Sequence, residues 1–79
     1  MDDGHLNSYE LLAIAIVREA SRDYMKALKA LKRNPGNRAA QFEKEAEERF
    51  FRSAWYMVLT DVDPEYLIRK LKEKVNYEG

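Results

Sequence analysis

The positions of glycine and proline most constrain what this chain can fold into. Its three glycines and two prolines fall at Gly4, Pro35–Gly36, Pro64 and Gly79. Because these residues interrupt helices, they leave two long segments and one shorter segment in which a helix can run unbroken. The chain has 79 residues and no cysteine. It is therefore expected to form one domain whose stability rests on buried apolar surface rather than on disulfides.

Helix start and stop signals place three helices within these segments. Asn7 followed by Glu10 is typical of a capping box, so the first helix is expected to begin directly after Asn7. The turn sequence Asn34-Pro35-Gly36-Asn37 ends that helix and folds the next one back antiparallel to it. Asp63-Pro64-Glu65 is typical of a further helix start. The three expected helices cover about 8–33, 38–60 and 64–75.

These helices predict an all-α fold, a three-helix bundle in which a long antiparallel helical hairpin is capped by the shorter third helix. Ser53 can bend the second helix locally, because serine hydroxyls compete for backbone hydrogen bonds. Residues 1–79 are expected to form a single domain, with 1–6 and 76–79 frayed.

Each long helix carries a main apolar stripe along its whole length and a second stripe along half of it. The main stripes hold Tyr9, Leu12, Ala13, Ile16, Val17, Ala20, Tyr24, Ala27, Leu28 and Leu31 in the first helix, and Ala39, Phe42, Ala46, Phe50, Ala54 and Met57 in the second. The second stripes hold Leu11, Ile14 and Ala15, and Phe51, Trp55, Val58, Leu59 and Val62. An antiparallel hairpin brings both second stripes to one end, where the third helix is expected to cover them. The end at the Pro35–Gly36 turn is expected to remain a bare pair of helices.

No pattern of residues predicts catalysis, a metal site or a cofactor. His5 is the only histidine, and it stands in the N-terminal segment without the orienting partner that a general base requires. Asp61, Asp63 and Glu65 alternate like ligands of a hard cation, but the glycine and the distal glutamate of a calcium loop are missing. Helix capping explains Asp63 and Glu65. The chain is therefore expected to be non-enzymatic, with no cofactor and no metal.

A basic cluster at the end of the first helix is the candidate for nucleic-acid contact. It consists of Arg22, Lys26, Lys29, Lys32 and Arg33. Positive charge gathered in this way can contact phosphates. The structural interpretation is stronger, because cations stabilise a helix C-terminus and acidic residues of the second helix can pair with them. Those acids are Glu43, Glu45, Glu47 and Glu48. A nucleic-acid-binding regulator is therefore the alternative hypothesis rather than the first.

Charge and hydropathy also bear on where the chain acts. Fourteen basic residues balance fourteen acidic ones, which fits a solvated helical surface rather than a chain that neutralises phosphates. The longest apolar run, Leu11 to Val17, is too short to span a bilayer. We therefore expect no membrane contact and a cytoplasmic location.

A protein partner or a second copy of the chain is the favoured kind of partner. The aromatic block from Phe50 to Tyr56 contains Trp, Tyr and Arg, which are enriched at binding hot spots. Core packing accounts for most of these rings, but incomplete cover by the third helix would leave an exposed apolar patch, which usually marks an interface. The possible partner-binding residues are Leu11, Ile14, Trp55 and Tyr56.

A further pattern runs from Phe50 to Leu71. It consists of Phe-Phe-Arg-Ser-x-Trp-Tyr and then Leu-Thr-x-x-Asp-x-Glu-Tyr-Leu-Ile-Arg-Lys-Leu. This pattern resembles a family of small helical proteins of prophages and mobile elements of Firmicutes. It departs from that family at Ala54, where similar sequences carry an acidic residue, and at Pro64, where they often carry glycine. The resemblance implies a phage or mobile-element origin, no established activity and no catalytic residue.

Overall fold

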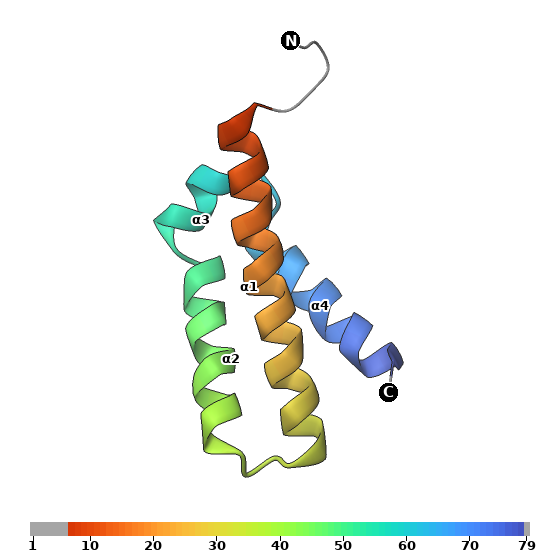
Figure 1. Ribbon diagram of the computed structural model, residues 1–79. Coiled ribbons are helices and arrows are strands. Elements are labelled where there is room, and N and C mark those ends of the chain that lie inside the picture. The colour runs from red at the N-terminus through yellow and green to blue at the C-terminus, as the bar shows by residue number, and fades with distance from the viewer. Residues whose placement is uncertain (1–6, 79) are drawn as a thin grey trace.

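The computed structural model describes residues 7–78, and within that range it is all-α. The helices are α1 (Ser8–Arg33), α2 (Arg38–Phe51), α3 (Ala54–Leu59) and α4 (Pro64–Glu78). In Figure 1, α1 runs along the length of the molecule, α2 returns beside it, α3 lies beside the first half of α1, and the segment after α3 passes behind α1 to α4. The expectations for residues 1–6, which include His5, and for Gly79 lie outside the described residues. No helix of the described part is long and apolar enough to cross a membrane.

The first helix and the turn after it confirm the sequence signals. The Asn7 side chain accepts a hydrogen bond from the Glu10 amide (2.7 Å), and the Glu10 carboxylate accepts one from the Asn7 amide (3.0 Å). In the turn, the Gly36 amide donates to Asn34 Oδ1 (3.1 Å). Asn37 then caps α2 with its side chain. These local bonds direct α2 back along α1 as an antiparallel partner.

The prediction of one helix over 38–60 is wrong, because the chain leaves the helix at Arg52–Ser53. The Ser53 hydroxyl donates to the carbonyl of Phe50 (2.6 Å) and accepts from the amide of Tyr56 (3.2 Å). The same oxygen thus binds the last turn of α2 and caps the first turn of α3. A bend expected at Ser53 is in fact a complete break between two helices.

The break changes which aromatic side chain enters the core. In a continuous helix, Phe51, Trp55 and Val58 would share one face. The new helix phase of α3 instead buries Tyr56 completely and leaves Trp55 52% exposed. The Tyr56 hydroxyl donates to the carbonyl of Val62 (2.8 Å), so its polar atom is satisfied inside the fold. The expectation of a partly exposed Tyr56 is therefore wrong.

Three aromatic rings form the centre of the core. Tyr24, Phe51 and Tyr56 are fully buried. Phe51 stands nearly perpendicular to the other two, with ring centroids 5.5 Å from Tyr24 and 5.9 Å from Tyr56, an arrangement that aromatic quadrupoles favour. The Tyr24 hydroxyl donates to Glu48 (2.6 Å). Ala20 of α1 and Leu71 of α4 are among the residues that complete this cluster.

The fourth helix lies elsewhere than the sequence predicted. Its apolar face packs against the middle of α1, where Ile68 and Leu71 join the aromatic core. It then runs toward the far end of α1, where Lys32 Nζ donates to the carbonyl of Val75 (3.3 Å). The half of the hairpin expected to remain a bare pair is therefore the half that α4 contacts. The cause is the break before α3, because the short helix carries the chain across α1 and delivers α4 to its middle.

The start of α4 at Pro64, after the cap Asp63, confirms the prediction, whereas its end lies beyond the predicted one. At its start, Glu65 forms a two-bond ion pair with Arg52 at the helix break, with N–O distances of 2.7 and 3.0 Å. This bond holds the pKa of Glu65 below its ordinary value. At its end, the helix continues to Glu78, where a frayed segment was expected from residue 76. The Glu78 carboxylate pairs with Lys74 (3.1 Å) and with Lys29 of α1 (3.3 Å), and these pairs hold the last turn.

Because Tyr56 rather than Trp55 lies in the core, replacing Tyr56 by alanine should destabilise the fold more than replacing Trp55. Tyr56→Ala should cost about 3–5 kcal/mol, as for other large buried aromatic side chains. Trp55→Ala should cost roughly half as much or less, because about half of the indole already lies in water. Urea unfolding of the two variants and the parent chain measures both losses. A larger loss for Trp55→Ala would contradict the helix break.

Candidate functional site

Three of the four predicted partner-binding residues are accessible. Leu11 is 57% exposed, Ile14 42% and Trp55 52%. Tyr56, the fourth, is buried in the core and cannot contact a partner. Since α4 packs on the middle of α1, it leaves Leu11 and Ile14 in water.

These three residues belong to a larger surface, which we call the apolar end. It comprises the exposed large apolar side chains of the first half of α1 and of α3, namely Tyr9, Leu11, Leu12, Ile14, Trp55, Met57 and Val58. The sequence placed Tyr9, Leu12 and Met57 in the main stripes and therefore in the core. They are exposed because α2 ends at Phe51, so that only the six-residue α3 lies beside this part of α1. Figure 1 shows the first turns of α1 extending past α3.

The size and charge of the apolar end set it apart from ordinary protein surface. Each of its seven large apolar side chains is between 42% and 61% exposed. Single exposed apolar residues are ordinary on a protein surface, whereas a group of them on two adjacent helices marks an interaction site. From Ser8 to Val17 the only charged residue is Glu10, and α3 carries no charge. A surface of this kind is suited to bury itself against another apolar surface.

An open groove runs along one side of the apolar end, between α1 and the end of α3. It consists of two adjoining hollows of about 420 Å³ and 240 Å³, which share Ala13, Ile14, Leu59 and Thr60. The acids Glu10 and Asp61 line the first hollow, and Arg18 lines the second. The groove therefore has apolar residues at its centre and opposite charges at its two ends.

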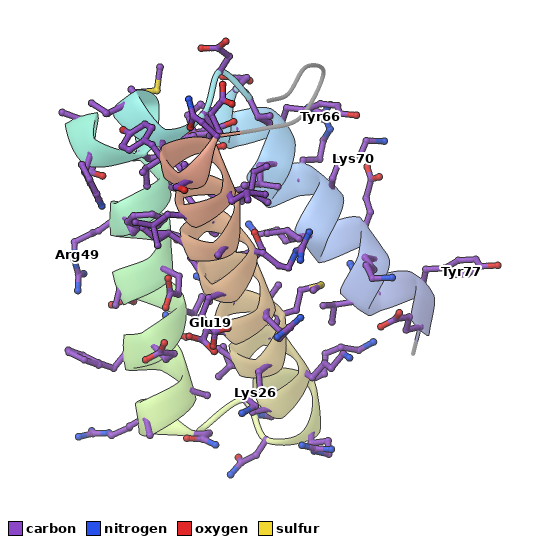
Figure 2. The ribbon with its side chains drawn as sticks, turned by 45° about the horizontal axis from the view of Figure 1, so that its top comes forward. Glu19, Lys26, Arg49, Tyr66, Lys70 and Tyr77 are labelled. Carbon is purple, nitrogen blue, oxygen red and sulfur yellow. The ribbon has the colours of Figure 1, made fainter. Side chains whose placement is uncertain are left out.

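The predicted basic cluster is partly engaged within the fold. Lys29 pairs with Glu78 of α4, and Lys32 donates to the carbonyl of Val75 near the C-terminus of that helix. A cation at this position is favourable, because the carbonyl end of a helix carries partial negative charge. Arg22 lies 3.8 Å from Glu19. Lys26 and Arg33 are exposed, and Figure 2 shows Lys26 on the half of α1 next to the turn.

The acids expected to pair with this basic cluster have other contacts. Glu48 pairs with Lys44 (3.3 Å) and accepts the Tyr24 hydroxyl. Glu45 accepts a hydrogen bond from Gln41 (2.6 Å). The basic cluster therefore gains its nearest acid from α4, whose position the sequence did not predict.

Sequence reasoning missed a carboxylate cluster between α1 and α2. Oxygens of Asp23, Glu43 and Glu47 lie within 4.8 Å of one another, and all three side chains are half-buried. Burial, followed by hydrogen bonding to Glu43 and the charges of Glu43 and Asp23, raises the pKa of Glu47 to about 7. The signal in the sequence was the spacing of Glu43 and Glu47, four residues apart and therefore on one helix face. The cluster can hold a proton between carboxylates, or a hard cation whose ligands are oxygens.

Comparison with known proteins found no match to this chain among family models, curated proteins or solved structures. The surface features of the protein itself, above all the apolar end, are therefore the basis for proposing a function.

The raised pKa of Glu47 predicts that Glu47→Gln increases thermal stability by an amount that depends on pH. In the folded chain the Glu47 carboxyl group keeps its proton up to a pH of about 7, whereas in the unfolded chain it loses the proton near its ordinary pKa of 4.5. Stability from this group is thus present at low pH and is lost as the pH rises between those values. Glu47→Gln should raise the melting temperature over the parent at about pH 8, and less at about pH 5.

Glu45→Gln is the matched control, because Glu45 lies exposed on the same helix outside the cluster. Thermal unfolding with a chelator present removes any contribution from bound cations. A gain of equal size at both pH values for Glu47→Gln would contradict the proposed burial of its charge.

Proposed function

We propose that this chain is a small, non-enzymatic protein-interaction module that binds a protein partner through its apolar end. The observation that carries the proposal is the accumulation of seven large, accessible apolar side chains on α1 and α3. Such surface is unfavourable in water, and burying it against a partner releases the free energy that drives most protein association.

The form of the surface also supports binding. The first half of α1 is a continuous helix closed by a capping box, so its side chains are presented on a rigid element. Trp55 and Tyr9 add large side chains with few rotatable bonds, of the kinds that often dominate binding energy. The adjoining groove gives a partner side chain a place to insert.

A nucleic-acid-binding regulator is the alternative proposal. Its support is the exposure of Lys26 and Arg33 at the turn end of α1. The engagement of Lys29 and Lys32 with α4 weakens it, because these cations already have partners within the fold. The interaction surface is therefore the better-supported proposal.

Origin and location are further proposals that rest on sequence alone. The resemblance of the stretch from Phe50 to Leu71 to the family of small helical proteins of prophages and mobile elements supports such an origin. The lack of a long apolar run supports a cytoplasmic location.

Photo-crosslinking in the cells that naturally produce the protein tests the proposed surface. A photoreactive benzoylphenylalanine is placed at Val58, which is 61% exposed and lines the groove. The control carries the same residue at Tyr77, which is 93% exposed on α4 and points away from the bundle (Figure 2). We expect a discrete protein adduct from Val58 and none from Tyr77. Equal labelling at both positions, or no adduct from Val58, would refute the proposal.

A further inference from the structure

Resting on the proposed interaction function, we propose that the partner is a second copy of this chain, bound by antiparallel contact between two α1 helices centred on Ile14. The contact surface is the face of α1 that holds Leu11, Ile14 and Arg18, next to the groove.

This face of α1 has the spacing of a helix-pairing seam, and its residues Ile14 and Arg18 also line the groove. Leu11, Ile14 and Arg18 follow one another at intervals of three and four residues, so they line one side of the helix. All three are exposed. The small Ala15 beside them, also exposed, lets a second helix approach closely. With Glu10 at one end and Arg18 at the other, this apolar seam fits a partner helix that has the same residues.

The charges at the two ends of the seam select the antiparallel orientation. Glu10 lies four residues before Ile14 and Arg18 four residues after it. When two copies meet antiparallel with Ile14 at the two-fold axis, each Glu10 lies beside the Arg18 of the other copy. A parallel pair would instead bring Glu10 against Glu10 and Arg18 against Arg18. Because a two-fold interface uses the same patch on both copies, one complementary pair per copy becomes two pairs per dimer.

The groove supplies the second wall of the contact. Leu59 and Thr60, at the end of α3, line the groove together with Ile14. Val58 and Tyr9 line the same hollow and extend the apolar contact beyond α1. Together with Leu11 and Ile14 on α1, these residues give each copy an exposed apolar surface that is flanked by the two opposite charges.

Sedimentation equilibrium of the purified full chain over a wide concentration range tests this proposal. The parent chain is expected to form dimers in the micromolar range. Glu10→Lys and Arg18→Glu should each weaken dimerisation about tenfold, because each replaces two symmetry-related attractions by repulsions. Raised salt should reduce the effect of both changes.

Two combinations of the charge changes test whether position 10 of one copy lies beside position 18 of the other. An equimolar mixture of the two single variants should recover parent-like affinity, since position 10 of each copy then meets a residue of opposite charge at position 18 of the other. The double variant E10K/R18E should also recover, because its exchanged charges again meet opposite charges. In a parallel dimer, like charges would face each other in the parent, in each single variant and in the double variant, so neither single change would weaken dimerisation, and the mixture would bind more tightly than the parent. Recovery by the mixture also excludes damage to the capping box as the cause of weakening by Glu10→Lys.

The outcomes distinguish failure of this proposal from failure of the proposed function. A parent chain that stays monomeric at all concentrations overturns the second-copy partner, as does a dimer that neither charge change affects. If crosslinking at Val58 then captures a different protein, the interaction function stands with another occupant. If crosslinking captures nothing, both fail.

Discussion

The Ser53 hydroxyl is the contact on which the rest of the structure depends. By bonding to the carbonyl of Phe50 and to the amide of Tyr56, it ends one helix and begins the next within two residues. A helical interior offers no such pair of partners to a serine, since its amides are already bonded to carbonyls four residues earlier. The chain therefore changes direction at this point, and the apolar residues that follow meet different neighbours.

This change of direction divides the molecule into a packed part and an open part. Tyr56 turns inward onto Phe51 and Tyr24, and α4 reaches the middle of the hairpin, where the buried residues concentrate. The ion pair between Arg52 and Glu65 holds that arrangement from outside. The first half of α1 is left with only α3 beside it, and its apolar residues stay in water. Stability and the candidate binding surface are thus products of the same helix break.

The sequence predicted the parts of this structure that depend on neighbouring residues. The starts at Asn7, Asn37 and Asp63 follow from side chains that accept hydrogen bonds from backbone amides three residues later, and the structure has all three. The break at Ser53 did not follow, because the apolar pattern continues through it and the helix was expected to bend there rather than to end. The position of α4 was missed because it depends on that break.

The residues of the candidate site were also predicted only in part from the sequence. Leu11, Ile14 and Trp55 were recognised as an exposed patch that incomplete cover would produce, whereas Tyr56 was wrongly included and Met57 was assigned to the core. Nuclear Overhauser contacts among the aromatic rings test the break most directly. The account predicts contacts between the Phe51 and Tyr56 rings, whose centroids lie 5.9 Å apart, and none between Phe51 and the Trp55 indole. Strong contacts from Phe51 to Trp55, with none to Tyr56, would mean that one helix runs through Ser53 and would contradict the account.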